Sequence, residues 1–259
     1  MVKKAIKSLQ VGGKEMRTGT LKQILLITDG CSNQGEDPAS IARIIAEQGI
    51  TVNVIGILEE TQTEESQGLN EVEEIASNGQ GVSQIVYKQA LSQTVQAVTK
   101  QAMNETLQGV VNKELQQILG NTRSMDELPP EQRGEVMEVV DELGETCDLE
   151  VLVLVDTSAS MTNKLPTVQE ALIDLSISMN ARIGRSRFSI YQFPGRRKPI
   201  HQLVDWTSKL ESISSIFAKI STGGVTPTGP ALKEAMHQFG KKSLKRRLFH
   251  NEYTDVEEA

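Results

Sequence analysis

The chain has 259 residues, which is long enough for one large domain or two small ones with a sizeable buried core. Only 3% of the residues are aromatic, so aliphatic side chains must form most of that core. A net charge of -7 disfavours nonspecific nucleic-acid binding. The aliphatic runs are too short to span a bilayer, and the basic N-terminus lacks the apolar stretch of a signal peptide. We therefore predict a cytoplasmic protein without a membrane span.

Residues 21–103 have the pattern of one half of an α/β domain. The unbroken aliphatic run at 24–27 is typical of a strand in a parallel sheet that is covered on both faces. The predicted elements are a strand at 24–27, a helix that begins at Asp37 and Pro38, a strand at 51–57, a short helix at 69–76 and a short strand at 84–87. Together they form a parallel strand, helix, strand arrangement.

Residues 104–148 are predicted to be a helical connector. Apolar residues recur at helical spacing from about residue 90 to residue 119, in one long helix or two. A polar, acidic stretch follows, and Pro129 and Pro130 precede a second helical pattern.

Residues 149–240 have the pattern of the other half of the same domain. The predicted elements are a strand at 151–155, a helix with its apolar face between Val168 and Met179, a strand at 188–193, a weaker strand at 203–206, a turn-rich loop at 222–230 and a helix ending near Phe239. The remaining segments, 1–20 and 241–259, are predicted to be charged tails. The fold class is therefore α/β, a doubly wound and mostly parallel sheet with helices on both faces.

Two of the predicted strands end in carboxylates. Asp156, Ser158 and Ser160 alternate directly after the strand at 151–155, and Asp29 follows the strand at 24–27. Ligands of an open parallel sheet bind beyond the carboxyl ends of its strands, where the strand order reverses. We therefore expect these oxygen donors to lie on one edge of the sheet. In a simpler interpretation Asp156 only caps the following helix and the serines are turn residues.

These motifs resemble the metal-ion-dependent adhesion site (MIDAS) of the von Willebrand factor A (VWA) domain family, and in particular the small VWA proteins of spore-forming bacilli. The family pattern is Asp-x-Ser-x-Ser after one strand, a threonine in a loop before a helix, and Asp-Gly after another strand. Asp156, Ser158 and Ser160 match the first motif, Thr226 the second and Asp29 the third. The resemblance implies that these five residues bind one metal ion.

The order of the motifs differs from that of the family. Here the Asp-Gly half, with Asp29, precedes the Asp-x-Ser-x-Ser half, so the chain resembles a circularly permuted VWA domain. A doubly wound sheet keeps its contacts when the chain is cut in a surface connection and the old ends are bridged. The connector at 104–148 would provide that bridge. We favour closure of the sheet within one chain, because the connector is long enough to return across a domain of this size, and a swapped dimer is the alternative.

Two carboxylates and three hydroxyls favour Mg2+ or Mn2+ over Zn2+, because hard cations prefer oxygen ligands. Neutral hydroxyls leave the cation short of anionic ligands, so that an acidic residue of a partner protein could bind it. We therefore expect a metal-dependent protein-binding module and no enzyme. Other VWA proteins suggest an AAA+ ATPase as a partner. The alternative is an Mg2+-dependent hydrolase of the phosphatase type with Asp156 as nucleophile, although Ser158 stands where such enzymes need a second acid.

Overall fold

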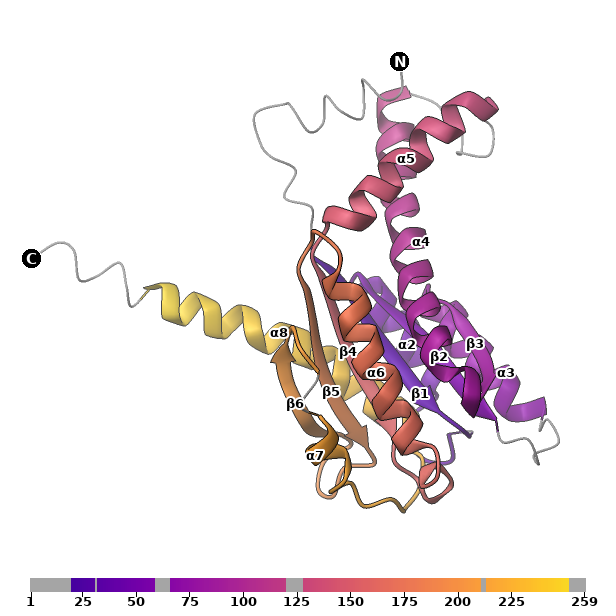
Figure 1. The fold of residues 1–259 in the computed structure, drawn as a ribbon, viewed down its shortest axis with the longest axis vertical. Helices are drawn as coiled ribbons and strands as arrows, with labels where there is room; N and C mark the ends of the chain where they lie inside the picture. The colour runs from indigo at the N-terminus through magenta and orange to yellow at the C-terminus, as the bar shows by residue number, and fades with distance from the viewer. Residues whose placement is uncertain (1–19, 31, 59–65, 120–127, 211–212, 252–259) are drawn as a thin grey trace, which may run out of the picture.

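One six-stranded sheet forms the centre of the described part of the protein (Figure 1). The structure is a computed structural model that describes residues 20–30, 32–58, 66–119, 128–210 and 213–251. The strands are β1 (Leu21–Thr28), β2 (Ile50–Leu58), β3 (Ser83–Tyr87), β4 (Leu149–Asp156), β5 (Ser186–Phe193) and β6 (His201–Thr207). Their spatial order is β3-β2-β1-β4-β5-β6, and every neighbouring pair is parallel except the antiparallel pair β5 and β6. This confirms the predicted fold class.

Helices connect most of these strands. They are α2 (Pro38–Glu47), α3 (Ser66–Asn78), α4 (Leu91–Leu119), α5 (Pro130–Thr146), α6 (Leu165–Asn180), α7 (Ser214–Phe217) and α8 (Thr228–Asn251), with short 3-10 turns η1 (Lys88–Ala90) and η3 (Ala159–Met161). The start of α2 shows the predicted cap, because the Asp37 carboxylate accepts a hydrogen bond of 2.8 Å from the Ser40 amide. Pro38 follows at the first helical position, where its missing N–H costs nothing.

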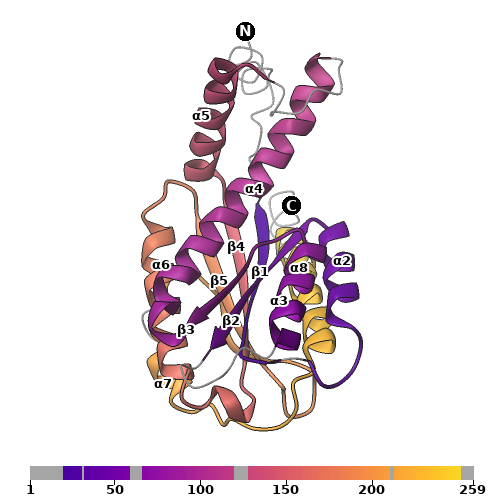
Figure 2. The same cartoon turned by 90° about the vertical axis from the view of Figure 1, so that its right-hand side faces the viewer.

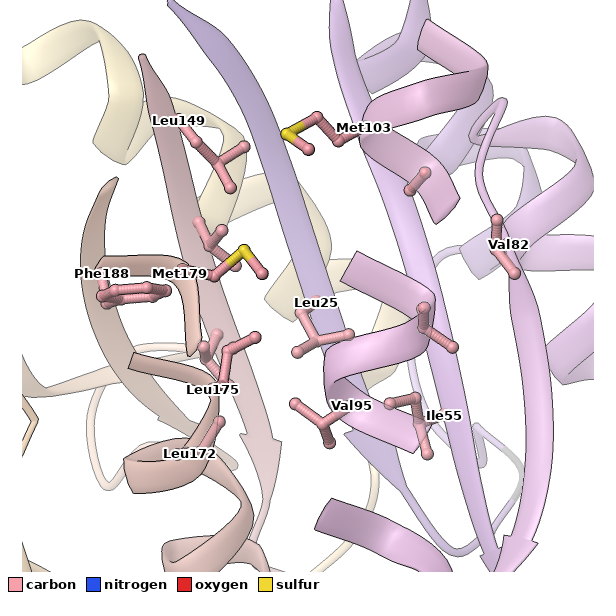
Figure 3. Close-up of a cluster of buried hydrophobic side chains, with 14 of the residues drawn as sticks. Leu25, Ile55, Val82, Val95, Met103, Leu149, Leu172, Leu175, Met179 and Phe188 are labelled. Carbon is pink, nitrogen blue, oxygen red and sulfur yellow. The ribbon is translucent and has the colours of Figure 1, made fainter. Parts of the chain in front are cut away.

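The helices cover both faces of the sheet, so successive residues of the central strands enter different cores. Leu25 and Ile27 of β1 pack with residues of α4, α5 and α6, whereas Ile24 and Leu26 pack with residues of α2, α3 and α8. Figure 2 shows α4 and α6 on one side of the sheet and α2, α3 and α8 on the other. Figure 3 shows Leu25 of β1 close to Val95 of α4 in the first of these cores. Burial on both faces explains why the central strands are unbroken aliphatic runs.

The described residues between the two halves, 104–119 and 128–148, are mostly helical, and among them no helix begins or ends at residue 104. One continuous helix, α4, runs from Leu91 to Leu119, and α5 lies beside its C-terminal part (Figure 1). Val111 of α4 and Val140 of α5 are buried in the same core as the sheet residues. Apolar packing thus continues from the sheet into α4 and α5. The helix α4 continues past the predicted connector boundary at residue 104 because the helical spacing of apolar residues continues there.

The helix that was expected to end near Phe239 continues to Asn251, which corrects the predicted end of this helix. Residues 241–247 are mostly Lys, Arg and Leu, which have high helix propensity, so a single glycine at position 240 does not end the helix. Within the described residues, no helix is both long and apolar enough to cross a membrane.

Candidate metal site

The two predicted aspartates lie at the carboxyl ends of neighbouring strands. β1 pairs with β4 in parallel, with Ile27 opposite Val155, so that Asp29 and Asp156 come at the same edge. The chain continues from β1 toward β2 and from β4 toward β5, on opposite sides of this pair. This is the point where the strand order reverses, and open α/β sheets bind their ligands there.

Hydrogen bonds join four of the five predicted site residues. The Ser160 hydroxyl donates to Asp29 Oδ1 at 2.8 Å and lies 3.1 Å from the Ser158 hydroxyl. Asp156 accepts from the Ser158 amide at Oδ1 and from the Thr28 hydroxyl at Oδ2, both at 2.8 Å. Asp29, Asp156, Ser158 and Ser160 therefore form one connected group of oxygen atoms, with Thr28 as an additional member that the sequence reasoning missed.

Thr226 is buried, and its backbone is hydrogen-bonded to the loop that follows β1. Its amide donates to Asn33 Oδ1 at 2.8 Å, and its carbonyl accepts from the Asn33 amide at 3.1 Å. Among the hydrogen bonds of the described residues, none links the Thr226 hydroxyl to either aspartate. Asn33 thus ties the loop before α8 to the loop after β1, which carries Asp29. The sequence offered a weak signal for Asn33, since it lies in the turn that follows the Asp-Gly motif.

A buried lysine is part of the site, and the sequence reasoning did not identify it. Lys164 Nζ lies 2.5 Å from Asp29 Oδ2, and the two side chains are 0% and 1% exposed. Lysine is almost never fully buried unless it is paired. The Asp29 carboxylate therefore receives the Ser160 hydroxyl on one oxygen and the Lys164 ammonium on the other. With Asp156 included, the formal charge of this group is -1, from two carboxylates and one ammonium.

Burial raises the pKa of Asp156 above its usual value, because desolvation penalises the charged carboxylate. The hydrogen bonds from Ser158 and Thr28 act in the opposite direction, and the negative charge of Asp29 adds to the increase of the pKa. A cation placed between the two carboxylates would favour their ionised forms. The residues present fit a hard cation, because carboxylate and hydroxyl oxygens meet here. In the described part of the chain, no group of three or more His, Cys, Asp or Glu could hold a metal ion, so the serine and threonine hydroxyls would be needed as ligands.

Two glycines allow the loops of the site to pack closely. A Cβ added at Gly35, which has a φ of +96°, would lie 2.4 Å from Pro230 Cγ, and one added at Gly229 would lie 1.9 Å from the Glu36 carbonyl oxygen. Both contacts join the loop after β1 to the first turn of α8. The loop that follows β1 is therefore packed closely against the start of the helix that follows Thr226.

We expect Gly229→Ala to lower the free energy of unfolding by roughly 1–3 kcal/mol, because the added methyl group must push two backbone segments apart. Urea unfolding monitored by circular dichroism would measure the change. Gly134→Ala is the matched control: nothing lies within 4 Å of its added Cβ on α5, so the helix should gain up to about 1 kcal/mol. Equal stability of the Gly229→Ala variant and the wild type would contradict the close contact.

Comparison with known proteins identifies the family. The sequence profile of the von Willebrand factor type A domain matches residues 1–105 and 150–254. The uncharacterized protein YabS of Bacillus subtilis (strain 168) is 60% identical over 233 residues, which cover 90% of this chain and 95% of that protein. The crystal structure of an uncharacterized protein from Alicyclobacillus acidocaldarius is 40% identical, with a TM-score of 0.78 over 87% of this chain and 96% of the other. Since the Asp-Gly strand β1 precedes the Asp-x-Ser-x-Ser strand β4, this chain belongs to the VWA domain family in circularly permuted order.

Proposed function

We propose that the protein is a metal-dependent protein-binding module. In this proposal Asp29, Asp156, Ser158, Ser160 and Thr226 hold Mg2+ or Mn2+, and the cation binds an acidic residue of a partner protein. VWA domains are generally protein-interaction modules without enzymatic activity, and the chain belongs to that family. The observation that carries the proposal is the connected group of carboxylate and hydroxyl oxygens at the ends of β1 and β4.

In this proposal the cation and the residues around it have different roles. The bound cation would be coordinated by a carboxylate of the partner. The serine hydroxyls are neutral ligands, so they would not cancel the positive charge of the cation. The bound cation would therefore retain affinity for a carboxylate of another protein. Lys164 lowers the negative charge of the site further by neutralising Asp29. Thr28 and the Ser158 amide orient Asp156 through its two oxygens.

Affinity capture from a native lysate of the source cells tests the proposal. We expect wild-type protein with Mg2+ to retain a set of partners that is lost both in Asp156→Asn and when wild type is treated with a chelator. An AAA+ ATPase is the partner class we propose to look for first. Asp141→Asn, an exposed position on α5, is the matched control and should retain the same partners as the wild type. Identical partners in all four samples would contradict metal-dependent recruitment.

One observation favours a second candidate, an Mg2+-dependent phosphatase. Such enzymes combine a nucleophilic aspartate with a lysine near the metal, and Lys164 lies beside Asp29. The side chain of Lys164 is fully buried and its ammonium is bonded to Asp29, and Ser158 occupies the place of the usual second acid. Turnover of a generic phosphomonoester that requires Mg2+ and disappears in Asp156→Asn would establish the enzyme. No turnover above that of the variant would leave the binding module as the function.

A further inference from the structure

A basic groove lies next to the candidate metal site. It has a volume of about 870 Å³ and is formed by the turn between β5 and β6, by α7 and by the loop before α8. Its apolar part includes Ile200, Leu203, Ile216 and Ile220, of which Ile200 is buried and the others are half-buried. A groove of this size is in the range of ligand-binding pockets.

The polar part of the groove is strongly cationic. Arg196, Arg197 and Lys198 lie on the turn between β5 and β6, Lys219 follows α7, and all four side chains are exposed. No Asp or Glu is present among the described residues that line the groove, although the whole chain has a net charge of -7. None of the four cations forms an ion pair with a carboxylate of the described residues. The groove therefore has an electrostatic potential opposite to that of the protein as a whole.

The turn that carries three of these cations is held in a compact conformation. The Gly195 amide donates to the Pro199 carbonyl at 3.0 Å, and a Cβ added at Gly195 would lie 2.4 Å from the Lys198 carbonyl oxygen. Binding to a held turn costs less conformational entropy than binding to one that must first become ordered.

Hydrogen bonds connect the groove to the metal-site loop. Thr222 and Gly223 line the groove. The Gly223 amide donates to the Thr157 carbonyl at 2.9 Å, and the Thr222 hydroxyl lies 2.7 Å from the Thr162 hydroxyl. Thr157 lies between Asp156 and Ser158 in the sequence. Figure 1 shows α7 at the end of the sheet where β1 and β5 end, and β4 runs parallel to both strands. The loops that form the groove and the loops that form the site therefore lie at the same end of the sheet.

We propose that this groove binds an acidic segment of the partner protein, next to the residue that ligates the metal. The inference rests on the proposed function, because the metal site binds one carboxylate and the groove binds the acidic residues that accompany it. Arginine guanidinium groups bind carboxylates with two parallel hydrogen bonds, which suits Arg196 and Arg197 to this role. The isoleucines and Leu203 would contact aliphatic side chains of the same segment. The partner is thus recognised as an acidic peptide with interspersed aliphatic residues.

A fluorescein-labelled peptide of alternating Glu and Leu, measured by anisotropy, tests the groove. The groove variant carries Arg196→Glu, Arg197→Glu and Lys198→Glu, all at exposed positions. We expect it to bind the peptide roughly tenfold or more weakly than the wild type, with a smaller dependence on salt. Stabilisation by Mg2+ alone, measured by thermal unfolding, should match that of the wild type. The control carries Arg43→Glu, Lys100→Glu and Arg133→Glu, which are exposed and change the net charge equally.

The outcomes separate the groove from the metal site. Unchanged peptide binding in the groove variant would overturn the proposal that the groove binds an acidic segment. Equally weakened peptide binding in the charge-matched control would overturn it as well. Peptide binding that is lost in the groove variant but does not depend on Mg2+ would support peptide binding by the groove and count against the proposed function. Absence of any response of the wild type to Mg2+ would also count only against the proposed function. Tighter peptide binding after deletion of residues 252–259, which include four acidic residues, would identify this segment of the chain as the occupant of the groove and would overturn the proposal of a partner segment.

Discussion

Lys164→Met is expected to lower the free energy of unfolding by about 3–5 kcal/mol, because it leaves the Asp29 carboxylate buried without its counter-ion. Methionine has a similar volume, so packing contributes little to this loss. For a domain of this size the melting temperature should fall by roughly 10 °C. The same variant should gain more stability from Mg2+ than the wild type does, because the cation would replace the missing ammonium. Thermal unfolding with Mg2+ and with chelator measures both effects.

Two controls separate the buried pair from a general effect of charge. Lys233→Met breaks the exposed pair with Glu36, in which the side chains are 51% and 50% exposed, and should cost less than about 1 kcal/mol. The double variant Asp29→Asn with Lys164→Met should be more stable than the sum of the two single changes predicts, because neither partner then remains as a buried charge. A loss below about 1 kcal/mol in Lys164→Met would show that the ammonium does not stabilise the site.

Asp156→Asn is expected to change stability in the opposite direction while it removes metal binding. In the metal-free protein it replaces a buried carboxylate by a neutral amide, which should raise the free energy of unfolding by about 1 kcal/mol. The amide can keep both hydrogen bonds: its oxygen accepts from the Ser158 amide, and its NH2 group donates to the Thr28 hydroxyl. That hydroxyl already has a second acceptor, the Gly30 carbonyl at 3.3 Å. The stabilisation by Mg2+ that we expect for the wild type should be absent in this variant.

The pH dependence of this gain follows from the raised pKa of Asp156. Between the ordinary aspartate pKa of 3.8 and the higher pKa in the folded protein, the folded state binds more protons than the unfolded state. The contribution of Asp156 to wild-type stability is therefore most favourable below 3.8 and is lost as the pH rises through the folded pKa. The advantage of Asp156→Asn should be largest at neutral pH and should shrink on acidification. An advantage that grows on acidification, in urea unfolding with chelator, would contradict the direction of the pKa shift.

The strands and most helices were predictable because their signals are local. The central strands β1, β2 and β4 are apolar runs that end where polar residues begin, and α2 begins with an Asp-Pro cap. The end of α8 was missed because Gly240 is followed by residues with high helix propensity, so the local signal for a stop was weaker than the tendency to continue. The spacing of apolar residues at 90–119 is compatible with one helix or two. The choice between them depends on how these residues pack in the core.

By itself the sequence determined which strands end in carboxylates, which side chains could serve as hard ligands and that the two halves occur in permuted order. Only the tertiary structure decided which groups meet: it pairs Lys164 with Asp29, bonds Asn33 to the backbone of Thr226, and brings Arg196 and Lys219 into one groove. Strand and helix patterns are set by neighbours within a few residues. Burial of the ion pair between Asp29, which follows β1, and Lys164, which precedes α6, depends on the packing of segments far apart in the chain. The local spacing of residues does not predict that packing.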